Sequence, residues 1–270
     1  MPKQLTEAQI AAFAREGYVA PVPVLTPAEV TRHRAALEAF ETAQGKPLGF
    51  PEKSKCHLLF GWADALVHHP AVLDAVEDLI GPDIMLLHFT LQTKEAHSPT
   101  FAEWHQDDAY FHLDPAEEVT AWLALSEASE LAGCMRMLPG SHLRGKATHV
   151  DRPDAEAIIR RSLAVEGLSP EDGVPAPLKA GEMSIHHTHT LHASGPNRAD
   201  DRRIGLTLSY IPTRCRPTNG VRPMALLVRG EDRYGFYERE ERLVEELSPV
   251  ARQAHRRGVG LFGQISGTRS

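Results

Sequence analysis

Cysteine is scarce in this chain of 270 residues, which contains only Cys56, Cys134 and Cys215. The three are far apart and form no metal-type pair, and an odd number of cysteines cannot build a disulfide framework. Long apolar runs are also missing, since no stretch approaches the roughly 18 apolar residues of a transmembrane helix. The first residues lack the apolar centre of a signal peptide. These absences predict a soluble, cytoplasmic protein with reduced thiols and no membrane partner.

An excess of positive charge is absent as well. The chain has 29 Lys and Arg against 36 Asp and Glu, which gives a net charge of −7. Nucleic-acid-binding domains usually carry a basic face, so a nucleic-acid partner is not expected. Hydrophobic residues make up 42% of the chain, enough for a sizeable core. The composition does not shift along the chain, so we expect one domain over residues 1–270.

The N-terminal part, residues 5–81, is expected to form helices. Thr6 and Thr26 each precede a Gln or Glu by three residues, at Gln9 and Glu29, which is the pattern of the capping box. The resulting helices are predicted to end at Gly17 and at Gly45. A third helix is predicted over residues 70–80 from its apolar spacing.

The predicted core, residues 83–235, is mainly β, with strands at 84–93, 101–105, 119–125, 134–138, 181–187 and 203–211. Many strands joined by long return connections favour a sandwich or jelly roll. Residues 145–180 form a polar insertion, expected to be helical over 154–163; a lid over a pocket and a surface excursion both remain open. Residues 236–257 are predicted to form a C-terminal amphipathic helix that packs on the domain or on a second subunit, so monomer and homodimer remain open.

Two segments carry the chemistry of the chain. His105 and Asp107 are two residues apart, and on a strand such residues project to the same face. A distant histidine would complete two imidazoles and a carboxylate, a ligand set that suits non-haem Fe(II) because it leaves coordination positions open. The best candidate is His192, at the end of a histidine cluster that begins at His186. Strand alternation alone does not select His192, because a bend is expected before it.

Arg203 follows on an apolar strand and is suited to bind a carboxylate, since its planar guanidinium pairs with two carboxylate oxygens at once. Together, the segments 104–110, 133–142 and 181–203 resemble the phytanoyl-CoA dioxygenase family of Fe(II)- and 2-oxoglutarate-dependent oxygenases. The resemblance extends over roughly residues 5–235, in the expected order.

The resemblance implies a double-stranded β-helix, the jelly-roll core also found in cupins, with flanking helices. It further implies iron bound by His105, Asp107 and His192, and 2-oxoglutarate anchored by Arg203. Other residues match family positions around the co-substrate or the substrate: Ser194, Trp122 and, less securely, Gln92 for 2-oxoglutarate, and His187 near substrate or iron.

The implied reaction uses O2 and converts 2-oxoglutarate to succinate and CO2 while a C–H bond of a small molecule is oxidised. Because Asp107 is present, hydroxylation or desaturation is favoured over halogenation, which in related halogenases accompanies loss of the carboxylate. Tyr110 is a candidate for the pocket mouth, and Arg214 and Arg216 are candidates for meeting an anionic group of the substrate. A zinc hydrolase with the same ligands and a non-catalytic metal-binding jelly roll remain as alternatives, although neither explains Arg203.

Overall fold

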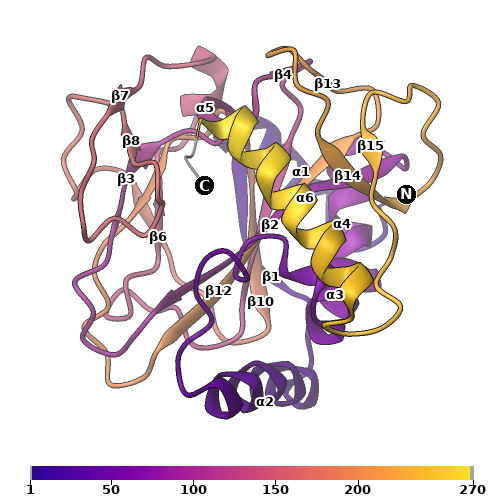
Figure 1. Cartoon of the computed structure of the whole chain (residues 1–270). Coiled ribbons are helices and arrows are strands. Elements are labelled where there is room, and N and C mark those ends of the chain that lie inside the picture. Colours follow the sequence, from indigo (N-terminus) through magenta and orange to yellow (C-terminus); the bar gives the residue numbers. More distant parts are fainter. Residues whose placement is uncertain (1, 268–270) are drawn as a thin grey trace.

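The computed structural model describes residues 2–267 as one β-rich body with helices on its outside (Figure 1). The α-helices are α1 (Glu7–Glu16), α2 (Pro27–Gln44), α3 (Gly61–Val67), α4 (Pro70–Ile80), α5 (Asp108–Phe111) and α6 (Pro249–Ser266). The longer strands are β1 (Tyr18–Pro23), β2 (Ile84–Lys94), β5 (Val119–Ala124), β10 (Glu182–His187), β12 (Arg203–Pro212) and β14 (Met224–Arg229). The shorter ones are β3 (Ala102–His105), β4 (Leu113–Asp114), β6 (Met135–Met137), β7 (Val150–Asp151), β8 (Leu163–Ala164), β9 (Val174–Ala176), β11 (His192–Ser194), β13 (Arg216–Pro217) and β15 (Glu238–Arg239). Short 3-10 helices cover Cys56–Leu58 and Ser141–Arg144.

Both predicted capping boxes are present. The Thr6 hydroxyl accepts from the Gln9 amide, and the Thr26 hydroxyl accepts from the Glu29 amide, while each N3 side chain bonds back to the cap. Gly17 and Gly45 end α1 and α2 in the left-handed region, where glycine carries no steric penalty. The sequence therefore determines these helix ends locally.

Two sheets form the jelly roll predicted for the core. The large sheet has the order β1-β10-β5-β12-β2-β14-β15, and the small sheet has the order β3-β11-β6-β9. Strands distant in the chain are neighbours in each sheet, as expected for a double-stranded β-helix. In Figure 1 the small sheet lies to the left, α3 and α4 to the right, and α6 crosses in front of the large sheet.

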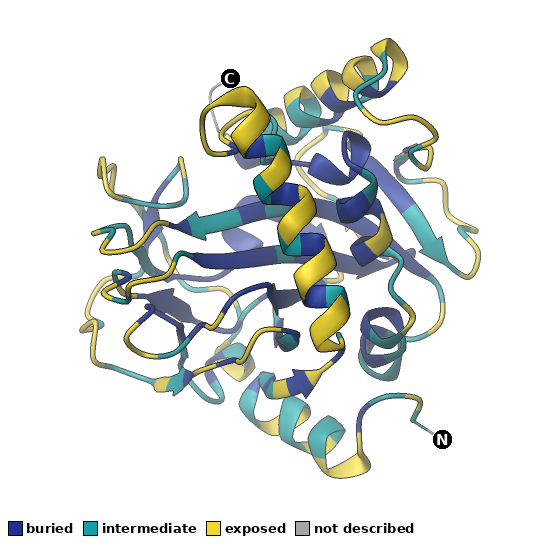
Figure 2. Ribbon diagram, turned by 90° about the horizontal axis from the view of Figure 1, so that it is seen from below, coloured by how far each residue is buried: buried dark blue, intermediate teal, exposed yellow. Residues whose placement is uncertain are grey.

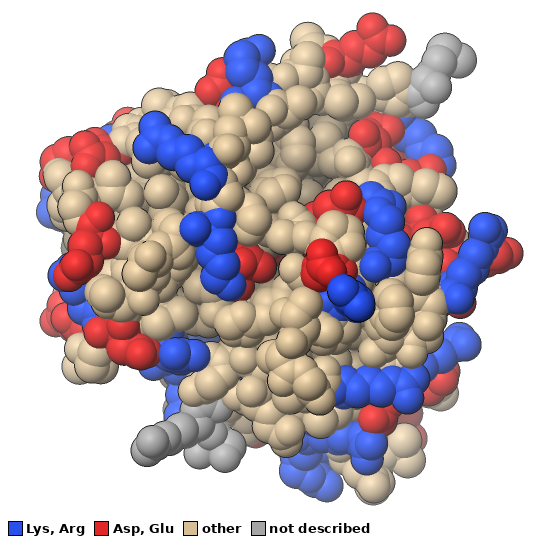
Figure 3. All heavy atoms as spheres, turned by 90° about the horizontal axis from the view of Figure 1, so that it is seen from above, with Lys and Arg blue, Asp and Glu red and all other residues tan. Residues whose placement is uncertain are grey.

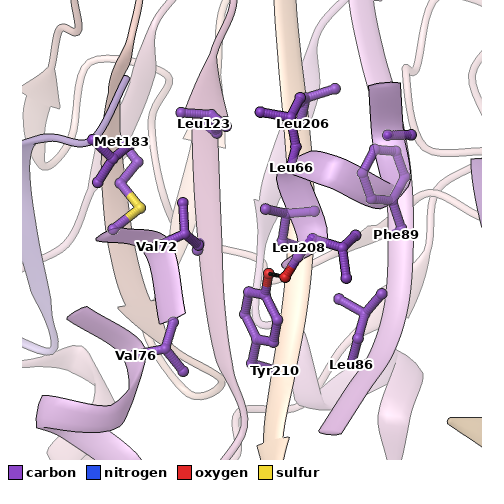
Figure 4. Packing of buried hydrophobic residues seen from close by; sticks show 14 of the residues in the cluster. Leu66, Val72, Val76, Leu86, Phe89, Leu123, Met183, Leu206, Leu208 and Tyr210 are labelled. Atoms are coloured by element: carbon purple, nitrogen blue, oxygen red, sulfur yellow. Dashed lines mark hydrogen bonds between the residues drawn. The ribbon is translucent and has the colours of Figure 1, made fainter. Parts of the chain in front are cut away.

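The two faces of the large sheet differ in polarity. One face carries Leu206, Leu208 and Tyr210 of β12, which pack with Leu66 of α3 and Val72 of α4 in the main core (Figure 4). Figure 2 shows that the strands are buried along most of their length. The opposite face carries mainly polar side chains, among them His88, Thr90, Gln92, Thr120, Ser184, His186, Thr207 and Ser209. Because side chains alternate along a strand, one set of strands builds both the core and a polar interior.

Two predicted helices differ from the structure. The C-terminal helix expected over 236–257 begins later, at Pro249, because Ser248 caps it through the Ala251 amide and Pro249 occupies its first turn. Residues 238–239 instead form β15, which pairs with β14. The segment 154–163 is not helical, because its chain makes turns and pairs with Phe101. The Phe101 amide donates to the Glu156 carbonyl, and the Ile158 amide donates to the Phe101 carbonyl. Strand β1 and helix α3 were not predicted.

The surface is of mixed charge. On the face drawn in Figure 3, Lys and Arg side chains lie among Asp and Glu, without a broad region of one sign. Among residues 2–267, no helix combines the length and hydropathy needed to cross a lipid bilayer.

Candidate metal centre

Three side chains converge at the open end of the small sheet. His105 is the last residue of β3 and His192 the first of β11, and the two lie opposite each other in the antiparallel register. Asp107 occupies the N-cap position of α5. One ligand atom from each residue lies within 4.8 Å of the others, and both imidazole Nε2 atoms lie 3.7 Å from Asp107 Oδ1. This is the arrangement of two histidines and one carboxylate expected from the sequence.

The route to this arrangement is different from the one expected. His105 and Asp107 do not lie on one face of a strand, because β3 ends at His105 and Asp107 already has helical dihedral angles (φ −64°, ψ −31°). The turn from strand into helix brings the carboxylate alongside the imidazole. Asp108 points elsewhere and forms an ion pair with Lys146 at 2.8 Å.

The two histidines are oriented for metal binding. The Nδ1 atom of His105 lies 2.7 Å from the Glu103 carbonyl oxygen, and that of His192 lies 3.0 Å from the Thr190 carbonyl oxygen. A proton on Nδ1 satisfies each carbonyl and leaves the Nε2 lone pair facing the other two ligands. Burial lowers the pKa of both rings, which favours the neutral form that a metal requires. The donor set therefore fits a non-haem iron ion.

The second oxygen of Asp107 is held from behind. Asp107 Oδ2 accepts from the Thr120 hydroxyl at 2.7 Å and lies 3.1 Å from His186 Nε2. Burial alone would raise the pKa of Asp107, but nearby His192 and His186 lower it below its ordinary range. His186 is buried, and its ring lies against this carboxylate. Its position leaves Oδ1 free to face the histidines.

Glu118 extends this network by one residue. Its fully buried carboxyl lies 2.7 Å from the same Thr120 hydroxyl that donates to Asp107. Burial, and then the charge of Asp107, raise the pKa of Glu118 well above its ordinary value. A hydroxyl has one proton to donate, so a protonated Glu118 that donates to Thr120 accounts for both short contacts.

A second cluster contains buried positive charge. Arg203 is 2% exposed, donates to the Gly133 carbonyl at 2.6 Å, and has its guanidinium carbon 5.1 Å from the centre of the Trp122 ring. Lys94, fully buried, donates to the Ser194 hydroxyl at 2.8 Å. Burial lowers the pKa of Arg203 to about 10, and burial together with Arg203 lowers that of Lys94 to about 5. Arg203 is therefore the charged member of this cluster near neutral pH. Within residues 2–267 it has no carboxylate partner, so it is suited to bind an anionic ligand.

One cavity of about 510 Å³ joins the two clusters. Most of the predicted site residues line it: His105, Asp107, His192, Arg203, Ser194, Trp122, Gln92 and Tyr110. The lining also includes residues 158–161 of the insertion and residues 259–266 of α6, together with Phe50 and Lys53. Segments distant in the chain therefore close the mouth of the cavity.

Three residues predicted to lie near the substrate are outside the cavity wall. Arg214 is exposed and pairs with Glu117 at 2.6 Å, and neither Arg214 nor Arg216 is part of the cavity wall. Arg216 pairs with Asp114. His187 faces His142 and His189, with ring centres 5.6 and 5.4 Å away, on the side of β10 opposite to His186. The strand alternation that brings His186 into the interior turns His187 out of it.

Comparison with known proteins agrees with this fold. The family model for phytanoyl-CoA dioxygenase matches residues 13–205. A solved structure of the apo form of the non-haem monooxygenase ThoJ is 33% identical to this chain, with a TM-score of 0.83. The alignment covers 97% of this chain and 100% of ThoJ.

Curated relatives include a probable α-ketoglutarate-dependent hypophosphite dioxygenase of Stutzerimonas stutzeri, 33% identical over 61% of this chain and 58% of that protein. The L-proline trans-4-hydroxylase of Streptomyces griseoviridis is 25% identical over 80% of this chain and 90% of that enzyme. The matches to phytanoyl-CoA dioxygenases themselves span less than half of those proteins, for example 45% of the human one. Because the family model covers well over half of the chain, the chain belongs to the phytanoyl-CoA dioxygenase family of Fe(II)- and 2-oxoglutarate-dependent oxygenases.

Proposed function

We propose that this protein hydroxylates an unactivated C–H bond of a small organic molecule, using Fe(II), 2-oxoglutarate and O2 and releasing succinate and CO2. The observation that carries the proposal is that two imidazole Nε2 atoms and one carboxylate oxygen meet in the same cavity as a buried arginine without an acidic partner among residues 2–267. A metal-binding scaffold or a zinc hydrolase needs the cluster of two imidazoles and a carboxylate but has no general use for the buried arginine.

In this proposal His105, Asp107 and His192 hold the iron. Their carbonyl and hydroxyl partners fix each donor atom before the metal arrives, so the ion meets a preorganised site. When bound, iron supplies the oxidising chemistry with the keto acid and O2. The carboxylate of Asp107 occupies one position, which favours hydroxylation over halogenation.

Arg203 is assigned to the distal carboxylate of 2-oxoglutarate. Its guanidinium is held by Gly133 and lies near the Trp122 ring, so it can present its remaining N–H groups as a fixed fork. Ser194 and Gln92 line the same region, and the Gln92 Oε1 atom is buried without a hydrogen-bond partner among residues 2–267. We assign both to the co-substrate.

The test is an anaerobic titration of the purified protein with Fe(II) and then 2-oxoglutarate. A visible charge-transfer band is expected when the keto acid chelates iron, followed by succinate formation when O2 is admitted. The His105→Ala variant should lose both signals while keeping its circular dichroism spectrum. The His142→Ala variant is the matched control, since His142 lies outside the cavity. Metal binding without the band or succinate would contradict the proposal.

A further inference from the structure

We propose that the substrate is an organic anion, whose charged group is bound by Lys53 and Arg160 at the mouth of the cavity while its apolar body extends toward the iron site. The inference rests on the proposed function, because it names the class of molecule that this site oxidises.

The charges around the cavity are unbalanced. Four lining side chains are cationic, namely Lys53, Arg160, Arg161 and Arg203, whereas Asp107 is the only carboxylate among the lining residues described in 2–267. A bound Fe(II) ion and a 2-oxoglutarate dianion cancel each other, and Arg203 compensates Asp107. Arg161 is already paired with Asp151 at 3.1 Å. Lys53 and Arg160 are left without compensation.

Lys53 is the more informative of the two cations. Its side chain is partly buried in the cavity wall, and within residues 2–267 its ammonium group makes neither a hydrogen bond nor an ion pair. Burial, and secondarily Arg160, lower its pKa. A partly buried ammonium group without a protein partner is less well solvated than one at the open surface, so an opposite charge in the cavity would stabilise it. An anionic ligand would supply the missing partner.

Arg160 is an exposed residue of the cavity wall, and its guanidinium contacts one aromatic ring. Its guanidinium carbon lies 4.0 Å above the centre of the Phe50 ring. This stacking leaves the edge of the guanidinium plane, with its N–H donors, available to a carboxylate or phosphate group. Lys53 and Phe50 come from one loop and Arg160 from the insertion, so the two cations approach the mouth from different segments.

The remainder of the wall indicates an apolar body. Phe111, Phe262, Ile158 and Ile159 line the same cavity. The volume of about 510 Å³ lies in the range of small-molecule sites. A bare inorganic anion would leave these surfaces in contact with water, so an organic anion fits better than one without carbon.

The test is calorimetric titration of the full-length protein, held anaerobic and saturated with Fe(II) and 2-oxoglutarate, with three probes of similar shape. Phenylacetate and phenylphosphonate are anionic, and phenylacetamide is neutral. Both anions should bind more tightly than the amide, and the tighter of the two distinguishes a carboxylate from a phosphate-type substrate. Saturation with 2-oxoglutarate prevents the probes from occupying its site.

The variants Lys53→Gln and Arg160→Gln should each weaken anion binding by roughly tenfold, as expected for a charge-assisted hydrogen bond. They should leave the affinity for phenylacetamide unchanged. Arg214→Gln is the matched control, because Arg214 is an exposed cation outside the cavity, and it should not alter the binding of any probe.

Equal affinity for the amide and the anions, or anion binding that ignores both substitutions, would overturn the inference. So would failure of both anions to bind at millimolar concentration. The charge-transfer band of the wild-type protein distinguishes a failure of this inference from a failure of the proposed function. If the band appears but anions are not preferred, the anion-site inference is wrong and the proposed iron chemistry still stands. If the band is missing, the proposed function itself is wrong.

Discussion

Arg203 and Lys94 are two buried basic side chains at one end of the cavity, and their geometry predicts different roles. Arg203 lines the cavity, whereas Lys94 donates to Ser194 from behind it. Replacing Arg203 with Gln should raise the apparent KM for 2-oxoglutarate by roughly 100-fold or more, since a buried charge partner is lost. Lys94→Met should raise it less. Steady-state succinate formation at varied 2-oxoglutarate measures both; an unchanged KM in Arg203→Gln would show that the anchor is misassigned.

Other residues around the metal centre could not be predicted individually. The strand register brings His186, Glu118 and Lys94 to the site. For example, it places His186 opposite Thr120 on the neighbouring strand. The sequence did contain a signal for His186: Ser184 and His186 alternate with the apolar Met183 and Ile185, so they share the polar face of a half-buried strand. Of the proposed iron ligands, His105 and Asp107 were paired from strand alternation, although β3 ends at His105, whereas His192 was selected by the family resemblance.

At the scale of single elements, the N-terminus of α2 has a pH-dependent stability. The Glu29 carboxylate accepts from the Thr26 amide and hydroxyl, both at 2.8 Å. The Thr26 backbone hydrogen bond is the main cause that lowers the pKa of Glu29 to about 2, from 4.5 ordinarily. A carboxyl with a depressed pKa stabilises the fold above its unfolded-state pKa, and this contribution is lost as the pH falls from about 4.5 through about 2.

Glu29→Gln keeps a hydrogen-bonding side chain but removes the charge. We expect it to lower the free energy of unfolding at pH 6 by about 1 kcal/mol or less, and we expect the difference from wild type to shrink on acidification. Urea denaturation between pH 3 and pH 6 measures it, with Glu245→Gln as an exposed control. A difference that stayed constant over this range would contradict the charge-based account.

Strand β12 requires a glycine where it passes Trp122. A Cβ atom on Gly205 would lie 1.9 Å from Trp122 Cζ2, well inside any allowed contact. Gly205→Ala should therefore displace the indole from beside Arg203 and weaken 2-oxoglutarate binding, at a stability cost of about 1–3 kcal/mol. Adding Trp122→Phe should restore part of the binding.

The measurements are the KM for 2-oxoglutarate and tryptophan fluorescence. Gly49→Ala serves as the control, because a Cβ at Gly49 meets nothing within 4 Å. Normal kinetics and fluorescence in Gly205→Ala would mean that the indole position is unimportant for the co-substrate.

Helix ends with capping boxes could be predicted because their signals are local. The predicted start of the C-terminal helix was wrong. Apolar residues near Leu243 favoured an early start, but Ser248 and Pro249 define where the helix begins. The segment 154–163 was expected to be helical from its polarity, but its backbone partners lie in distant segments such as Phe101. Such long-range pairing leaves no periodic pattern in the sequence.

At the scale of the whole molecule, the cavity is a product of topology. Its floor comes from the polar face of the large sheet and from β3 and β11, and its mouth from the 158–161 segment and α6. The jelly roll and the cluster of two histidines and one carboxylate could be anticipated from motifs in the expected order. The mouth of the cavity could not be anticipated. It depends on how the insertion and the C-terminal helix, whose lining residues are more than 90 residues apart in the sequence, pack across the same opening.

The assignment of iron to His105, Asp107 and His192 is tested most directly by anomalous diffraction at the iron edge, on crystals grown anaerobically with Fe(II). The expected map has one strong peak at about 2 Å from His105 Nε2, Asp107 Oδ1 and His192 Nε2. It should have no comparable peak near the half-buried histidines His142, His187 and His189. A principal peak at those histidines, or full iron occupancy in crystals of the Asp107→Ala variant, would contradict the assignment.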